Sequence, residues 1–141
     1  MSETYNPNKS SPTYTPLLRV STSQNGTYVE VPAPSSYKFA EEDISANNAG
    51  RTADYKMNKL RKATIVKIEL QWNYPTIATA SQILTQFNPE YIWVKYLNAR
   101  TGMIETSEFY VGNRNSPLFN GETQRWTSVA FNIIERQGTV Y

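Results

Sequence analysis

The sequence predicts a mainly β domain, an antiparallel β-sandwich or partly closed barrel with one flanking α-helix over about residues 76–87. Several short runs alternate apolar and polar residues with the period of two that is typical of strands. Only one window has apolar residues at helical spacing. Strands and helices do not alternate along the chain, so a parallel sheet built from βαβ units is not expected.

The 141 residues have room for one domain of ordinary size. Residues 1–16 are rich in Pro, Ser, Thr and Asn, and their only large apolar side chains are Tyr5 and Tyr14. Such a segment is either a disordered terminus or an extended arm that orders against a neighbouring subunit through these two tyrosines. We expect residues 17–136 to form a single β-rich domain and residues 137–141 a short tail.

A hairpin is expected directly after the arm. Residues 17–20 and 28–31 are strand-like, and Asn25-Gly26 lies between them. This dipeptide favours a type I′ turn, in which both central residues have positive φ. A further short strand is expected over residues 37–43. Residues 44–62 are poor in apolar side chains and predict a long exposed loop or a protruding hairpin.

The segment from Arg51 to Lys67 carries six cations and one acid, Asp54. Such clustering suits nucleic-acid phosphates, but only Tyr55 is present to stack on a base. An acidic patch on a neighbouring protein is therefore the favoured partner, and nucleic acid the less favoured one. The side chains expected at such an interface are Arg51, Tyr55, Lys56, Lys59, Arg61 and Lys62.

The clearest element is a strand with one buried face. Val66, Ile68, Leu70, Trp72 and Tyr74 alternate with four polar residues. No helix would keep these five side chains on one side.

A helix is expected next, with Thr76 capping its start and Asn88-Pro89 ending it. Its apolar face has spacings of three, four and three, formed by Ile77, Ala80, Leu84 and Phe87. Serine and threonine within the window weaken its intrinsic propensity, so packing on the sheet must stabilise it.

Three more strands follow. In the first, Ile92, Val94 and Tyr96 alternate with Trp93, which we expect against the helix or at an interface. After a turn at residues 98–102, residues 103–111 return and bury either Phe109 and Val111 or the opposite set. The last strand covers residues 126–134. The predicted core comprises Val66, Ile68, Leu70, Trp72, Leu84, Phe87, Val129, Phe131 and Ile133.

Composition argues against catalysis. The chain has no cysteine and no histidine, which removes disulfides, thiolate metal sites and His-dependent nucleophiles. The one acidic cluster, Glu41-Glu42-Asp43, is expected in a solvated loop, and adjacent residues of an extended chain point to opposite faces. We expect a protein that is not an enzyme and that uses no cofactor, metal or small-molecule substrate.

The surface composition favours permanent contact with proteins. Only 18% of residues are charged, while tyrosine occurs ten times and tryptophan three times. The first residues do not form a secretion signal, and no apolar run is long enough to cross a bilayer. We expect no membrane partner and a cytoplasmic starting point.

Several short motifs follow one another in a fixed order over about three-quarters of the chain, and together they form a pattern typical of one protein family. They are Pro32-Ala33-Pro34-Ser35-Ser36-Tyr37, Asp43-Ile44-Ser45, Arg61-Lys62, Ile68-Glu69-Leu70-Gln71-Trp72, Phe109-Tyr110-Val111-Gly112-Asn113-Arg114, Ser116-Pro117, and Trp126 with Val129-Ala130-Phe131-Asn132-Ile133-Ile134-Glu135-Arg136. With these motifs the chain resembles a family of small tail-module proteins of phages and prophages of Gram-positive bacteria.

The resemblance implies a structural virion protein with a fold like that of tail-tube and distal-tail proteins. Its partners would be copies of itself in a ring and other virion proteins, and its location the phage tail or baseplate, after a stage in the host cytoplasm. The N-terminal arm departs from the family's core. The alternatives are a head–tail connector, a capsid decoration or receptor-binding accessory protein, and a β-module that binds carbohydrate or nucleic acid through Tyr91, Trp93 and Tyr96 or the basic segment.

Overall fold

The fold is built around one antiparallel sheet. The computed structural model describes residues 3–45, 50–51, 57–58, 61–112, 118–137 and 139–140. The strands follow one another across the sheet in the order β3 (Ser36–Ser45), β6 (Arg61–Asn73), β11 (Ser128–Glu135), β8 (Ile104–Val111), β7 (Ile92–Leu97), β1 (Arg19–Ser21) and β2 (Val29–Glu30). The mainly β, antiparallel prediction is confirmed, and the described strands do not close into a barrel.

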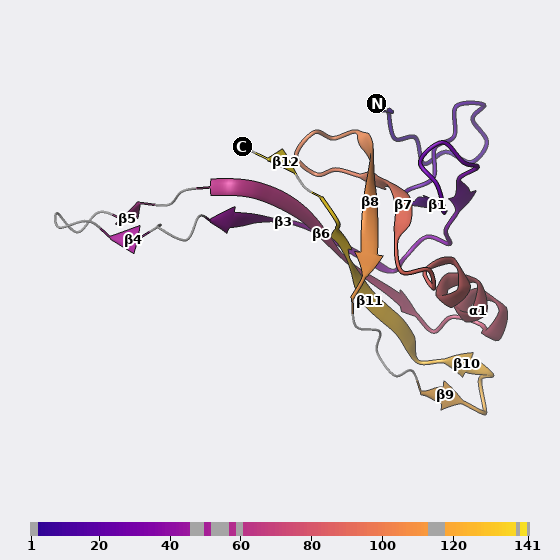
Figure 1. The fold of residues 1–141 in the computed structure, drawn as a ribbon. Coiled ribbons are helices and arrows are strands. Elements are labelled where there is room, and N and C mark those ends of the chain that lie inside the picture. The colour runs from indigo at the N-terminus through magenta and orange to yellow at the C-terminus, as the bar shows by residue number, and fades with distance from the viewer. Residues whose placement is uncertain are drawn as a thin grey trace.

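Two separate two-stranded ribbons and one short strand lie at the ends of the sheet (Figure 1). The ribbon of β4 (Gly50–Arg51) and β5 (Met57–Asn58) projects beyond β3 and β6, so the described parts of residues 44–62 form a hairpin rather than an open loop. A second ribbon, β9 (Phe119–Asn120) with β10 (Arg125–Trp126), lies at the end where the helix α1 (Ile77–Gln86) begins. Strand β12 (Thr139–Val140) pairs with β6 beyond the end of β11.

Strand β6 is the spine of the sheet. Val66, Ile68, Leu70 and Trp72 are buried, as the alternation predicts. Tyr74 is a correction, because its side chain is 66% exposed. Its φ of 52° turns the chain out of the strand before α1, so the apolar alternation ends at Trp72.

Helix α1 confirms the predicted helical window but not its whole face. The hydroxyl of Thr76 accepts a hydrogen bond from the backbone N–H of Thr79, as expected of an N-cap. The buried face is centred on Ala80, Ile83 and Phe87, with Leu84 partly buried beside it. Ile77, in the first turn of the helix, is 55% exposed and does not belong to the buried face.

The centre of the core is aromatic. The ring of Phe87, the C-cap of α1, lies 6.4 Å from Trp72 of β6 and 4.9 Å from Phe131 of β11, measured between ring centroids. The rings of Trp72 and Phe131 are themselves 5.5 Å apart. The indole N–H of Trp72 donates to the carbonyl of Pro32 at 2.8 Å, so the ring is buried with its polar atom satisfied. Val129 and Ile133 flank Phe131 on the buried face of β11.

Strands β7 and β8 complete the core. Ile92, Val94 and Tyr96 are buried on β7. On β8 the period of two is broken, since Ile104 and Phe109 are both buried while Val111 is only partly so. Neither of the two alternating sets therefore describes the whole strand.

The first hairpin pairs as expected, but its turn differs. Arg19 lies opposite Glu30, which confirms the antiparallel pairing of β1 and β2. Neither Asn25 nor Gly26 has a positive φ, so the type I′ turn is wrong. Residues 22–28 form a wider loop, and at its start the Ser21 hydroxyl donates to the carbonyl of Ser23 at 2.8 Å. A loop of this length needs no mirror-image turn.

Residues 3–16, here called the N-terminal strap, fold back onto their own chain. Glu3 pairs with Ile104 as an isolated antiparallel bridge, and Asn6 pairs with Thr15. In this structure the strap thus makes its contacts with its own chain.

No helix in the described part of the chain is long and apolar enough to span a bilayer.

Candidate functional site

The edge strand β3 leaves one side of its backbone open along ten residues of the described structure. It pairs with β6 along its whole length, with a register shift between Ile44 and Ser45. Because β3 and β11 both pair with residues 67–71 of β6, they lie on opposite sides of it, and no described strand covers the far side of β3. A long open edge is a template for pairing with another chain. The other border of the sheet, β2, has only two residues.

Side chains on the inner face of β3 fix the position of this edge. The hydroxyl of Tyr37 donates to the carbonyl of Leu97 on β7 at 2.6 Å. Burial raises the pKa of Tyr37, which keeps the hydroxyl protonated as a donor. Phe39 packs against the core, and Glu41 forms an ion pair with Arg100 at 2.8 Å. The open edge is therefore presented by a strand held at several points.

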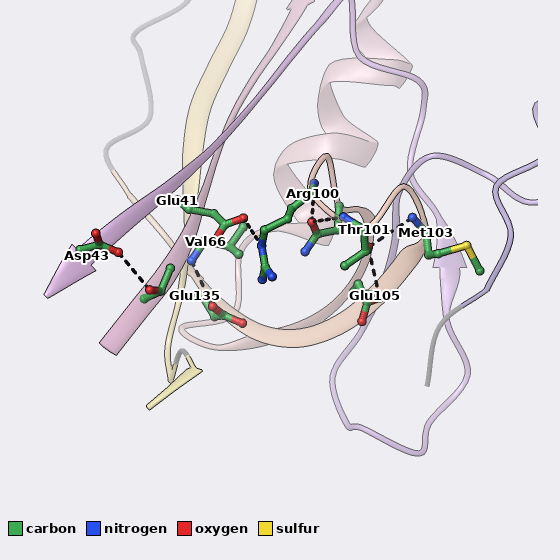
Figure 2. Close-up of polar contacts among 10 residues, drawn as sticks. Glu41, Asp43, Val66, Arg100, Thr101, Met103, Glu105 and Glu135 are labelled. Carbon is green, nitrogen blue, oxygen red and sulfur yellow. Dashed lines mark hydrogen bonds and ion pairs between the residues drawn. The ribbon is translucent and has the colours of Figure 1, made fainter. Parts of the chain in front are cut away.

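A small polar cavity of about 160 Å³ lies at the end of β3 next to the β7–β8 turn (Figure 2). The Glu135 carboxylate accepts from the backbone N–H of Val66 at 3.0 Å, and the hydroxyl of Thr101 donates to Glu105 at 3.4 Å. The Asn98 side chain accepts from the backbone N–H of Arg100 at 2.8 Å. These polar groups hold strands and a turn together.

The acidic cluster predicted in a solvated loop lies on β3 instead. Glu41 binds Arg100, Glu42 lies 3.7 Å from Lys67, and Asp43 accepts from the hydroxyl of Thr64 at 3.0 Å. Within the ranges that the structure describes, no group of three acidic side chains is arranged to hold a metal ion. Strand β6 supplies the partners of Glu42 and Asp43, and the β7–β8 turn supplies that of Glu41, which a local sequence pattern does not give.

The outer face of the sheet is polar and balanced in charge. A shallow hollow of about 650 Å³ lies over β3, β6 and β11. Lys38 lies 3.6 Å from Glu69 across the β3–β6 pair. The neighbouring Gln71 and Asn132 are uncharged, so this face offers hydrogen-bonding groups and paired ions rather than a field of one sign.

The predicted interface residues do not form one cluster. The Tyr14 hydroxyl donates to Glu30 of its own chain at 3.2 Å, and Tyr5 and Trp93 are half-buried. The backbones of Arg51, Arg61 and Lys62 belong to β4 and β6. Tyr55, Lys56 and Lys59 lie outside the described residues.

Sequence reasoning missed an exposed apolar group where α1 meets the β9–β10 ribbon. Leu118 is 73% and Phe119 41% exposed, and Tyr74 and Ile77 at the start of α1 are exposed as well. Backbone bonds hold the ribbon there, from Trp126 N–H to the Pro75 carbonyl and from Tyr74 N–H to the Thr127 carbonyl, both 3.1 Å. The sequence does hold one sign of a contact surface here, because residues 75–89 contain no charged side chain and depletion of charge is typical of interfaces.

The comparisons with known proteins bear on the fold. No protein-family model matches the chain, and no curated protein matches it by sequence. Among solved structures, the chain is similar to a chain from the tail of an empty GTA particle, determined by helical refinement with C6 symmetry. The TM-score is 0.60 with 9% sequence identity, and the match covers 89% of this chain and 93% of the other. At this identity the likeness is one of fold.

Proposed function

We propose that this chain is a structural protein of the tail of a bacteriophage or phage-like particle. In this role it is a ring-forming tube protein or a distal-tail adaptor of the baseplate that joins neighbouring tail proteins. The observation that carries the proposal is the open edge of β3 in a chain whose fold is similar, over nearly its whole length, to that of a chain in a C6-symmetric particle tail. The role requires surfaces rather than a reaction, and the chain is proposed not to be an enzyme.

The two borders of the sheet suggest how copies would join. The β3 edge is ten residues long, whereas β2 at the other border has two residues. A contact that joins two different borders is heterologous, and such contacts close into rings when the rotation between subunits allows it. The proposed lateral contact is therefore head-to-tail, with backbone hydrogen bonds to β3 supplying part of it.

Two other surfaces suit contacts with further tail proteins. The apolar group of Tyr74, Ile77, Leu118 and Phe119 lies at one end of the molecule. The β4–β5 ribbon projects at the opposite end (Figure 1). A subunit with distinct surfaces at both ends fits an adaptor between successive layers.

The test uses the purified full-length chain at increasing concentration. Sedimentation velocity and negative-stain electron microscopy are expected to detect closed rings. Hydrogen exchange is then expected to slow in the β3 amides that do not bond to β6, because the ring gives them partners. The amides of central β6 serve as the internal control, since they are protected in both states.

Two results would contradict the proposal. A chain that stays monomeric at every concentration, and that does not join particles, would remove the tail role. Rings whose β3 amides exchange as fast as those of the monomer would show that the lateral contact lies elsewhere.

A further inference from the structure

Two cationic side chains lie side by side on neighbouring strands. Arg19 of β1 is the direct cross-strand partner of Lys95 of β7. Both side chains are more than three-quarters buried, with exposed fractions of 19% and 23%. Like charges directly opposite each other destabilise a sheet, so this pair requires a nearby anion.

Glu3 of the N-terminal strap provides that anion. One carboxylate oxygen lies 2.9 Å from Nη2 of Arg19, and the other lies 3.0 Å from Nζ of Lys95. The hydrogen bonds from Arg19 and then Lys95 lower the pKa of Glu3, so the carboxylate is ionised at neutral pH. Backbone bonds in both directions between Glu3 and Ile104, at 2.9 and 2.6 Å, hold it in place.

The rest of the strap has weaker attachments. No residue before Leu17 belongs to the hydrophobic core of the described structure. Between its two ends the strap bonds mostly to itself, for example from the Asn6 amide to the hydroxyls of Ser11 and Thr13. Its release would expose little apolar surface, so local opening at this terminus costs little compared with opening the core.

Glu3 leaves one donor of this site without a partner. Nε of Arg19 is buried and has no hydrogen-bond partner among the described residues. Because Glu3 divides its two oxygens between Arg19 and Lys95, it does not engage the guanidinium through two parallel bonds, the stronger geometry for this pair.

We propose that Arg19 and Lys95 form a carboxylate-binding site that Glu3 of a neighbouring copy fills when the chain assembles. The strap is exchanged between copies and re-forms in the neighbour the contacts that it makes within one chain. Exchange of an identical element conserves those contacts, and assembly brings a neighbouring strap to high effective concentration. The neighbour being a copy in a ring rests on the proposed function.

Disulfide trapping tests the exchange directly, because the chain has no cysteine of its own. Thr4 and Met103 are the next facing positions after the Glu3–Ile104 bridge. One preparation carries Thr4→Cys and another Met103→Cys, and the two are mixed under assembly conditions and oxidised. A mixed disulfide dimer on a non-reducing gel is the expected result. The double variant at high dilution is expected to close its disulfide within one chain.

Two controls make the result specific. A mixture of Thr4→Cys with Thr123→Cys, an exposed position in the β9–β10 turn, is expected to give only background dimer. Adding Glu3→Gln to the Thr4→Cys chain is expected to lower the dimer yield about tenfold, because it removes the charge-assisted bonds. An equal yield with Thr123→Cys, or a yield that Glu3→Gln leaves unchanged, would overturn the carboxylate site.

Microscopy of the same samples separates this inference from the proposed function. Rings without the mixed disulfide would overturn strap exchange and leave the ring role standing. Mixed disulfides without rings would support the exchange and count against the ring.

Discussion

The hydroxyl of Tyr37 on β3 donates a hydrogen bond of 2.6 Å to the backbone carbonyl of Leu97, the last residue of β7. The two residues are 60 positions apart in the sequence. The bond ties the open edge strand to the opposite part of the sheet, so the edge is held by more than its ladder to β6.

Tyr37→Phe is therefore expected to lower the free energy of unfolding by about 1 kcal/mol, the usual contribution of one such hydrogen bond. Urea denaturation measures it. The matched control is Tyr28→Phe, which removes a hydroxyl that donates to Gln24 within an exposed loop. Equal losses from the two variants would show that the Tyr37 bond does not stabilise the sheet specifically.

Trp72→Ala is expected to destabilise the chain by about 3–5 kcal/mol, because it leaves a cavity beside the rings of Phe87 and Phe131. Trp93→Ala, at a half-buried position on β7, is expected to cost less. The shift in the denaturation midpoint measures both changes. An unaltered midpoint for Trp72→Ala would contradict the central place of this ring in the core.

The docking of the strap is expected to depend on pH. Arg19 and Lys95 lower the pKa of Glu3 below its ordinary value of 4.5. The stabilisation is thus fully present above 4.5 and is lost as pH falls through the lower pKa of the folded state. Because the carboxylate is partly exposed, we expect an effect of about 1 kcal/mol or less.

Hydrogen exchange at the backbone N–H of Glu3 and Ile104 reports this release. Glu3→Gln is expected to make strap protection low and nearly independent of pH over the same range. If the variant kept the pH dependence of the native chain, another acid would be responsible.

The exposed apolar group is expected to matter for assembly and not for folding. Ile77→Asp changes a mostly exposed side chain, so the expected effect on unfolding free energy is within about 0.5 kcal/mol. Incorporation into tails or rings is expected to fall, as measured by co-sedimentation. Ser81→Asp, exposed on the same helix, is the control for added charge alone. Equal loss from both variants would argue against a specific apolar contact.

Local patterns were sufficient for the elements whose burial follows one period. The alternation from Val66 to Trp72 predicts β6, and the spacing around Ala80 predicts α1. The predicted buried face of the helix was shifted toward Ile77, because the sequence of the helix alone does not show which of its turns packs on the sheet. Ile83 was missed for the same reason.

Features that depend on distant pairing left no local signal. Whether β3 is a central or an edge strand follows only from the order of strands in the sheet. Its partner β6 begins after the β4–β5 ribbon, so their pairing is not local in the sequence. The Glu3 site joins residues 16 and 92 positions away. Asn25-Gly26 favours a type I′ turn, but the loop between β1 and β2 is longer than two residues and neither residue adopts the positive φ of that turn.

The two-sided pairing of β6 has a consequence for how the chain matures during synthesis. One edge of β6 pairs with β3, which is synthesised before β6. The other edge pairs with β11 and β12, which are synthesised later. Until those last strands emerge, the longest strand carries a bare flank that invites aggregation. Folding of the sheet therefore waits until β11 and β12 have been made, and a chain truncated before residue 128 would leave one edge of β6 unpaired.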